Sequence, residues 1–177
     1  FDDVHLGPET LIGGEGNGLR LALTALGRVR LAQVGARAVG KASRLLGYMA
    51  DYAGQREQFG SPIGSFQMVQ AMLADSAIEI NRSRLLLHRA AAALDAGEDY
   101  RSWISMLKVD PAEMLGRVAY RALHVFGGTG YTHGFPVERM YRDARIFRIF
   151  DGTSEIHRTV VAAGVLKGGA KTWDIGA

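Results

Sequence analysis

Two long stretches with helical periodicity constrain the fold more than any other feature of this sequence. Apolar residues recur at every third or fourth position over residues 18–53, and again over residues 66–97. An α-helix has about 3.6 residues per turn, so this spacing predicts one amphipathic helix for each stretch. Glycine and proline at Gly60, Pro62 and Gly64 should separate the two helices.

A third helical stretch covers residues 102–126 and contains Pro111. Proline inside a helix removes a backbone donor and clashes with the preceding turn, so a kink or a restart of the helix is expected there. Asp110 is suited to an N-cap and Pro111 to the first position of a restarted helix. The sequence then predicts a short helix at 137–145, an extended segment at 147–150 and a last helix at 153–166.

Long helices joined by short turns bury their apolar stripes against one another. The pattern therefore predicts an all-α fold, an antiparallel up-down four-helix bundle with a short extra helix, over residues 15–167. Residues 1–14 mix apolar residues with Asp, Gly and Pro, which favours a short strand and a turn. Residues 168–177 read as a flexible tail.

Composition and charge exclude several classes of function. The chain has no cysteine, which rules out disulfides, cysteine-based zinc sites and thiol nucleophiles. Its five histidines lack the spacing of metal ligands, and no run approaches the roughly 20 apolar residues of a membrane span. The formal charge of +3 comes from scattered arginines, which does not favour nucleic-acid binding. Without a signal-peptide pattern at the start, a cytoplasmic location is the default expectation.

The first segment that could carry chemistry lies where the first long helix ends. Arg56 precedes Phe59 and a tight turn at Gly60, so a guanidinium could clamp a phosphate while the ring covers a flat ligand. Taken alone, the segment is better explained by Arg56 capping the helix. Gln67, at the start of the next helix, is a weak signal by itself.

Glycines mark the second segment, residues 124–131. Gly127, Gly128 and Gly130 would let the backbone approach a ligand closely, and exposed amides bind anions. A helix end followed by a turn explains one or two of these glycines but not all three. The segment follows a helix, so it is not the dinucleotide fingerprint of a Rossmann fold.

The third segment places Asp151 between Phe150 and Gly152, just before the last helix. Aspartate is a preferred N-cap, and Asp-Gly is a common turn. Physical reasoning on these residues alone therefore favours a capping role over a catalytic one.

Together and in this order, these segments resemble the acyl-CoA dehydrogenase family. The motifs that carry the resemblance are Arg56-x-x-Phe59-Gly60-x-Pro62-Ile63-x-x-Phe66-Gln67, Gly127-Gly128-x-Gly130-Tyr131, Pro136-Val137-Glu138-Arg139, Tyr141-Arg142-Asp143-Ala144-Arg145 and Gly152-Thr153-Ser154-Glu155-Ile156. The match covers residues 1–166 and implies the family's carboxy-terminal helical domain, with residues 1–14 as the tail of a preceding β-domain.

The resemblance implies an FAD cofactor, much of whose pocket lies outside this chain. Arg56 would meet the FAD pyrophosphate, with Phe59 and Gln67 nearby, often serving the flavin of a neighbouring subunit; this implies a homodimer or homotetramer. The residues implied for the adenosine end are His124, Val125, Phe126, Gly127 and Gly128. Those implied at the other flavin are Thr153, Ser154 and Glu155. The chain alone is expected to fold without holding FAD stably.

The resemblance also implies a reaction. Asp151 falls on the position of the base that removes the α-proton of an acyl-CoA thioester while hydride leaves the β-carbon for flavin N5, giving 2,3-enoyl-CoA. Gly152 and Arg30 are the implied substrate contacts, and an electron-transferring flavoprotein is the implied electron acceptor. A dry carboxylate within hydrogen-bond reach of the α-proton is what this chemistry needs.

Three departures from the family pattern bear on this reaction. Most members have Glu at the position of Asp151, and the shorter side chain withdraws the carboxylate by about 1.5 Å, where a 1 Å misplacement can cost roughly 10²-fold in rate. His124 replaces a common Gln, and Arg30 lies one position off the spacing expected from Arg56. Two alternatives stay open: a flavoprotein oxidase similar to nitroalkane oxidase, and an inactive homologue serving as an oligomeric or adaptor bundle.

Overall fold

The computed structural model describes residues 1–98 and 100–169. In chain order, the α-helices are α1 (Gly18–Arg30), α2 (Arg37–Gln55), α3 (Gln67–Asp95), α4 (Arg101–Phe126), α5 (Gly128–Tyr131), α6 (Val137–Ile146) and α7 (Ser154–Gly168). Short 3-10 turns lie at η1 (Pro8–Thr10) and η3 (Ile63–Ser65), and a π-helical turn, η2 (Leu31–Ala36), joins α1 to α2. A small hairpin, β1 (Glu57–Gln58) and β2 (Ser61–Pro62), separates α2 from α3.

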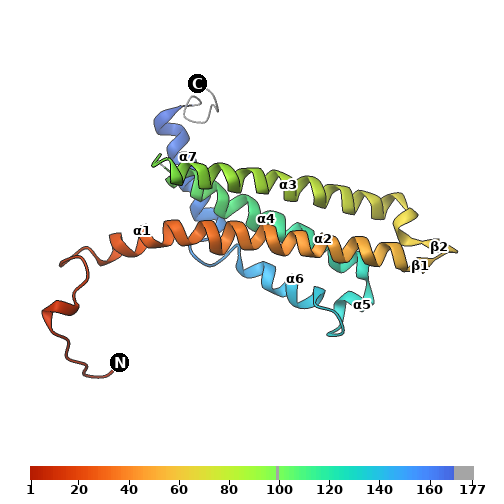
Figure 1. Cartoon of the computed structure of the whole chain (residues 1–177), viewed down its shortest axis with the longest axis horizontal. Helices are drawn as coiled ribbons and strands as arrows, with labels where there is room; N and C mark the ends of the chain where they lie inside the picture. Colours follow the sequence, from red (N-terminus) through yellow and green to blue (C-terminus); the bar gives the residue numbers. More distant parts are fainter. Residues whose placement is uncertain (99, 170–177) are drawn as a thin grey trace.

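Helix α2 continues the direction of α1, while α3 and then α4 each run back along the helix before it (Figure 1). Helix α4 is central, because it packs against α2, α3, α6 and α7. This arrangement confirms the predicted all-α antiparallel bundle. The predicted helix over residues 66–97 is also confirmed: α3 ends at Asp95, and Gly97 follows with a φ of 71°.

The core is built from side chains that α2 and α4 turn toward each other. Leu45 and Met49 of α2 and Leu115 and Val118 of α4 are fully buried. Each such side chain contributes on the order of 1.5–3 kcal/mol when it leaves water. Alanines at the same interface, among them Ala119, keep the two helices close.

Pro111 does not interrupt α4, so the predicted restart at this residue is wrong. The helix is continuous from Arg101 to Phe126 with Pro111 inside it. Asp110 is not an N-cap, because its carboxylate accepts hydrogen bonds from Arg82 and Ser83 of α3. Burial of the Pro111 ring and these contacts with α3 offset the backbone bond that proline removes.

Residues 147–150 form helical turns, so the predicted extended segment is also wrong. Their amides bond to carbonyls three or four residues back, as Phe150 N does to Ile146 O at 3.1 Å. Phe147 is only 2% exposed, and burying its ring in the core keeps the chain coiled against α4. Tertiary packing here overrides the strand preference of an aromatic and β-branched run.

The predicted strand within residues 1–14 is wrong as well. The described structure gives this segment only the short turn η1, and its side chains are largely exposed. A strand needs a neighbouring strand to satisfy its backbone groups. The assignment of residues 1–14 to a preceding β-domain stays a prediction, and residues 170–177 of the predicted tail lie outside the described residues.

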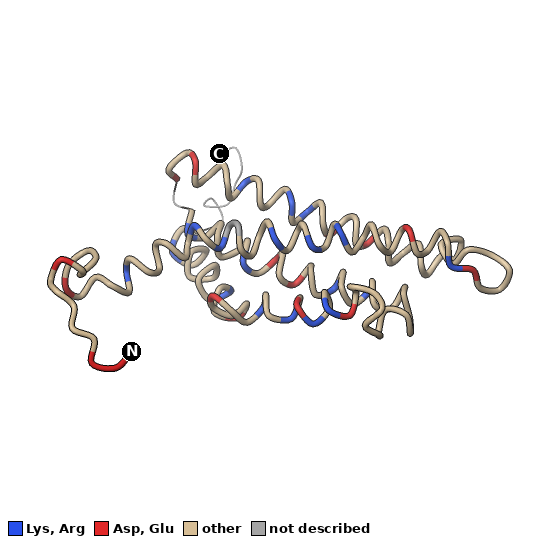
Figure 2. Tube along the Cα trace, turned by 60° about the horizontal axis from the view of Figure 1, so that its bottom comes forward, with Lys and Arg blue, Asp and Glu red and all other residues tan. Residues whose placement is uncertain are grey.

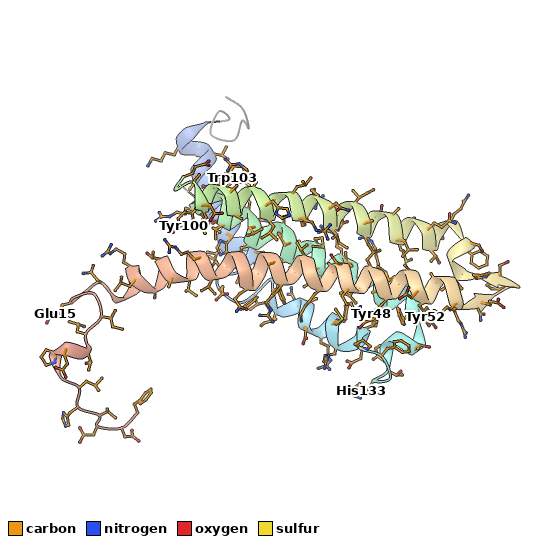
Figure 3. The ribbon with its side chains drawn as sticks, viewed as in Figure 1. Glu15, Tyr48, Tyr52, Tyr100, Trp103 and His133 are labelled. Atoms are coloured by element: carbon orange, nitrogen blue, oxygen red, sulfur yellow. The ribbon has the colours of Figure 1, made fainter. Side chains whose placement is uncertain are left out.

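Charged side chains are spread along the helices in both signs, and basic residues do not form one continuous block (Figure 2). Within the described residues, no helix is long and apolar enough to cross a membrane. At one end of the bundle, Tyr100 and Trp103 lie where α4 begins (Figure 3). Toward the other end, Tyr52 bonds Thr129 of α5 through its hydroxyl at 3.4 Å.

Candidate functional site

Asp151 lies in the loop between α6 and α7, in the left-handed conformation with a φ of 55°. Its backbone carbonyl faces Arg30 Nε at 3.0 Å and His157 Nε2 at 3.1 Å. The residue is half-buried, and within the described chain no hydrogen bond or ion pair of its carboxylate is recorded. The backbone of residue 151 is therefore fixed while its carboxylate stays available.

Thr153, and not Asp151, caps the last helix. The Thr153 hydroxyl accepts a hydrogen bond from the amide of Ile156 at 3.3 Å, and α7 begins at the next residue, Ser154. The capping role that the residues alone favoured for Asp151 is therefore wrong. The catalytic alternative gains support, because the helix already has its cap.

Arg30 reaches this loop in spite of its offset from the expected spacing. The π-helical turn η2 lies between Arg30 and α2. A π turn takes in one residue more than an α turn, and such turns occur often at functional sites. The extra residue of this turn can compensate for the one-residue offset between Arg30 and Arg56. The half-buried Arg30 contacts the carbonyl of Asp151.

The other residues predicted near the start of α7 differ in exposure. Glu155 is exposed, and hydrogen bonds from its own amide and from Thr153 hold its pKa below the ordinary value. Ser154 is fully buried, and its hydroxyl has no hydrogen-bond partner within the described residues. Gly152 has a φ of 89° and is exposed.

A buried polar cluster that the sequence did not predict lies near Asp151. Lys108 of α4 is fully buried, and its ammonium donates to the carbonyl of Phe147. Burial lowers the pKa of Lys108, although the nearby carboxylate of Asp151 acts in the opposite direction. His157 is 5% exposed and lies between Asp151 and Ser105. One sequence signal could have revealed this cluster: Lys108 has helical spacing from Ile104 and Pro111, which places a charged residue on the apolar face of α4.

A second group of predicted residues gathers at the hairpin that follows α2. Phe59 and Gly60 have φ values of 53° and 78°, as a two-residue type I′ turn requires. A bulky residue in this conformation is unusual, and Phe59 is 94% exposed. Arg56 ends α2 through its amide, while its exposed guanidinium has no recorded ion pair in the described chain. Gln67 is exposed at the first position of α3.

The end of α4 lies close to this hairpin. Phe126 stacks on Tyr52 of α2 with ring centroids 4.2 Å apart. The side chains of Val125 and Phe126 are buried, so they can offer a ligand only backbone groups. His124 is exposed, and a side chain built on Gly127 or Gly128 would meet nothing within 4 Å; the three face open space.

The two groups lie toward opposite ends of the bundle, with α6 running between them (Figure 1). The ten residues of α6 span about 15 Å. One isoalloxazine ring cannot touch both groups. The expectation that Arg56 and Asp151 serve two different flavins stays a prediction.

The chemistry of the hairpin group fits a dinucleotide cofactor. An exposed guanidinium suits a pyrophosphate, an exposed aromatic ring suits a flat base, and open glycines leave room for both. These are properties of Arg56, Phe59, Gly127 and Gly128. Within the described residues, no cluster of acidic or histidine side chains could hold a metal ion.

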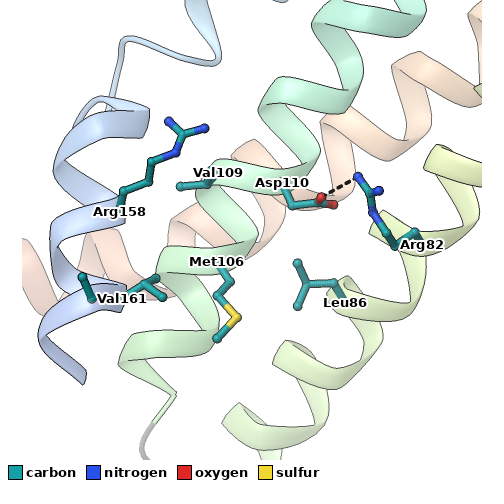
Figure 4. Close-up of a pocket in the computed structure, with 8 residues that line it drawn as sticks. Arg82, Leu86, Met106, Val109, Asp110, Arg158 and Val161 are labelled. Carbon is teal, nitrogen blue, oxygen red and sulfur yellow. Dashed lines mark hydrogen bonds and ion pairs between the residues drawn. The ribbon is translucent and has the colours of Figure 1, made fainter. Parts of the chain in front are cut away.

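Two surface hollows lie elsewhere. An apolar one of about 510 Å³ lies between α3, α4 and α7, beside the Arg82–Asp110 ion pair (Figure 4). A larger one of about 940 Å³, between α4 and α6, is lined by five arginines and by Glu113. None of the predicted site residues lines either hollow.

The chain is similar to known proteins over most of its length. Residues 16–166 match the family described as acyl-CoA dehydrogenase, C-terminal domain. Acryloyl-CoA reductase (NADH) of Anaerotignum propionicum is 40% identical over 167 residues, covering 94% of this chain and 42% of that protein. The mitochondrial short-chain specific acyl-CoA dehydrogenase of Bos taurus is 36% identical over 167 residues, covering 94% of this chain and 40% of that protein.

Solved structures show the same similarity. Butyryl-CoA dehydrogenase from Megasphaera elsdenii superposes with a TM-score of 0.90 at 34% identity, over 94% of this chain and 43% of that one. A chain in the structure of the electron transferring flavoprotein of Acidaminococcus fermentans gives a TM-score of 0.91 at 36% identity, over 94% of this chain and 44% of that one. The chain thus spans 40–42% of the length of the two curated relatives. It belongs to the acyl-CoA dehydrogenase family, whose carboxy-terminal helical domain it forms.

Proposed function

We propose that this chain carries the α-proton base, Asp151, of an FAD-dependent acyl-CoA dehydrogenase. One observation carries the proposal: a half-buried carboxylate, for which the described chain offers no hydrogen bond or ion pair, stands on a backbone that two side chains hold in place. Structural carboxylates in this protein are paired instead, as Glu79 is with Arg117 and Arg121. A positioned base without a structural partner is what proton abstraction needs.

In this reaction Asp151 takes the α-proton of the acyl thioester. The electrons of the broken α-carbon–hydrogen bond form the new double bond, and hydride leaves the β-carbon, giving the 2,3-enoyl thioester. FAD supplies, when bound, the acceptor for that hydride. Asp151 also presents its backbone amide, which can donate to the thioester carbonyl and so acidify the α-proton.

The remaining predicted residues hold the cofactor and the substrate. Arg56 neutralises the pyrophosphate, while Phe59 and Gln67 lie beside it; His124 and the open glycines that follow line the adenosine end. Thr153 and Glu155 approach the other flavin from the start of α7. Ser154 lies between them, but its amide donates to the carbonyl of Arg148 at 3.0 Å and its side chain is buried. Gly152 leaves space for the substrate next to the base.

Arg30 has a different part in the proposal from the one that the resemblance implied. Its Nε is already bonded to the carbonyl of Asp151. We therefore assign Arg30 to positioning the base, while its terminal guanidinium nitrogens stay available to a substrate.

The proposed partners follow from the same reading. The substrate is an acyl-CoA, and electrons leave through an electron-transferring flavoprotein. The hairpin group serves the flavin of a second subunit, which requires a homodimer or homotetramer built on the bundle. The cytoplasm is the proposed location.

The test is an anaerobic titration of the full-length protein that contains this chain with a panel of acyl-CoAs, following the visible absorbance of the flavin. We expect bleaching by at least one acyl-CoA. In Asp151→Asn, flavin stays bound and bleaching slows by about 10²- to 10⁴-fold, the contribution of a general base. Asp95→Asn, an exposed aspartate at the end of α3, is the matched control and should bleach normally.

Three outcomes would contradict the proposal. If the flavin of Asp151→Asn bleached at the rate of the unaltered protein, Asp151 would not be the base that takes the α-proton. Oxygen consumption with nitroethane, without bleaching by any acyl-CoA, would favour an oxidase similar to nitroalkane oxidase. A colourless full-length protein that does not bind acyl-CoA would favour an adaptor.

A further inference from the structure

His157 is a buried histidine whose two ring nitrogens face groups of different chemistry. Nε2 lies 3.1 Å from the carbonyl oxygen of Asp151, and Nδ1 lies 3.2 Å from the hydroxyl of Ser105 on α4. A carbonyl can only accept a hydrogen bond, so Nε2 must carry the proton. In a neutral ring Nδ1 then accepts from Ser105, which can rotate its hydroxyl to donate.

The surroundings of His157 keep the ring neutral. Burial lowers the pKa of His157, and the cations Arg30 of α1 and Lys108 of α4 lower it further, against the contact with Asp151. His157 is 5% exposed and Ser105 4% exposed. Ser105 and the neutral ring of His157 therefore connect α4 to the loop through two hydrogen bonds.

The same carbonyl of Asp151 accepts a second hydrogen bond, from Arg30 at 3.0 Å. Two donors use both lone pairs of this oxygen and so fix the plane of the peptide that follows residue 151. Lys108 holds the other end of the segment by donating to Phe147. The left-handed conformation of residue 151 is unfavourable for aspartate by itself, so the surrounding contacts must maintain it.

Gly152 explains how the ring comes so close. A Cβ built on Gly152 would lie 3.0 Å from Nε2 of His157. That separation is tighter than ordinary van der Waals contact. A glycine at this position therefore allows the hydrogen bond between His157 and Asp151 to form.

We propose that the Ser105–His157 pair is a positioning device for Asp151: the carbonyl of Asp151 requires the Nε2–H tautomer, Ser105 donates to Nδ1 and holds the ring in place, and the Nε2 proton, with Arg30, fixes the backbone from which the carboxylate projects. The inference rests on the proposed function. It adds that His157 and Ser105 act through Asp151 and contact neither substrate nor flavin. Loss of the pair should slow proton abstraction while leaving acyl-CoA binding unchanged.

The kinetic test uses the flavin-loaded full-length protein. In His157→Leu we expect single-turnover reduction of the flavin by acyl-CoA to slow by about 10- to 100-fold, as a displacement near 1 Å does, with an unchanged acyl-CoA Kd. In His157→Gln the amide can still donate to the carbonyl and accept from Ser105, so most of the rate should return. Reduction by His157→Leu at the unaltered rate would overturn the proposal, as would equal rates for the two variants.

A second readout is independent of turnover. In protein labelled with ¹⁵N-histidine, the ring shifts of His157 at neutral pH should be those of the neutral Nε2–H tautomer. Ser105→Ala should keep this tautomer but move the Nδ1 shift, because Nδ1 loses its hydrogen-bond donor. Ser76→Ala is the matched control, because Ser76 is a buried serine whose hydroxyl donates to the carbonyl of Met72 in its own helix. A protonated ring or the Nδ1–H tautomer would overturn the proposal.

The two tests separate this inference from the proposed function. If no acyl-CoA reduces the flavin of the unaltered protein, the proposed function fails, while the tautomer of His157 and the response of its Nδ1 shift to Ser105→Ala still decide the structural part. If acyl-CoA does reduce the flavin and His157→Leu reacts normally, only the positioning role fails. His157→Gln guards against a folding defect, because it keeps a polar group in the buried position.

Discussion

A left-handed aspartate followed by a glycine shapes the loop before α7. Asp151 and Gly152 have φ values of 55° and 89°, a region that side chains with a Cβ enter only at a cost of about 1–3 kcal/mol. At Asp151 two hydrogen bonds to the carbonyl offset this cost. At Gly152 the cost is absent, and the missing Cβ also leaves room for His157.

Gly152→Ala should therefore destabilise the chain through two effects, the strained φ and a collision with the His157 ring. We expect a loss of roughly 2–4 kcal/mol in the free energy of unfolding in urea. Gly97→Ala is the matched control, since Gly97 has a φ of 71° and nothing lies within 4 Å of its built Cβ. Equal losses in the two variants would show that the contact with His157 has no energetic weight.

His157 also predicts a dependence of stability on pH. Burial lowers its pKa in the folded chain, so below the unfolded value of about 6.5 the unfolded state binds a proton that the folded state does not. Stability is therefore unaffected by this group above that pH and falls as the pH drops below it. The free energy of unfolding in urea should differ less between mildly acidic and neutral pH for His157→Gln than for the unaltered chain. An identical difference would contradict this assignment.

At the scale of the elements, Glu79 joins α3 to α4. Its carboxylate receives hydrogen bonds from Arg117 at 2.8 Å and from Arg121 at 2.9 Å. Partial burial would raise the pKa of Glu79, but the two arginines outweigh this effect and lower it. The pair of helices is thus held by apolar packing, by this shared carboxylate and by the contacts of Asp110 with Arg82 and Ser83.

Glu79→Gln should cost about 1–3 kcal/mol at neutral pH, the range for hydrogen bonds to a charged group that is partly buried. The folded pKa of Glu79 is depressed, so its contribution is present above the unfolded value of 4.5 and is lost as the pH falls through the folded value. The difference in the free energy of unfolding between Glu79→Gln and the unaltered chain, measured in urea, should therefore become smaller in acid. Glu98→Gln, which breaks a more exposed pair with Arg89, should cost less than about 1 kcal/mol. A gap that widens in acid would be inconsistent with a paired carboxylate.

Local patterns predicted the elements well where packing agrees with propensity. Periodicity located α3 to within two residues at either end, and the motif before α7 located that helix. Periodicity failed at Pro111 and at residues 147–150, where contacts with distant helices override local preference. Ser105 and His157 escaped notice for the same reason: they are 52 residues apart, and only the fold joins them.

At the scale of the whole molecule, several large apolar side chains are exposed on the surface. Phe59, Tyr131 and Leu166 are 94%, 78% and 88% exposed. The chain also spans only 40–42% of the length of its two curated relatives. The candidate cofactor residues lie in two groups toward opposite ends of the bundle, so each offers a flavin a single surface (Figure 1).

A cofactor held on one side only is bound weakly, because binding sites for small molecules are concave and cover most of the ligand. We therefore expect the 177-residue chain to fold as a helical bundle and to emerge colourless from gel filtration after incubation with FAD. Circular dichroism would verify the folded state, and full-length protein treated in the same way, which should emerge yellow, is the control. A yellow chain with one FAD for each polypeptide would mean that the hairpin group or the start of α7 encloses a flavin by itself, and that the remaining parts of the relatives are dispensable for holding the cofactor.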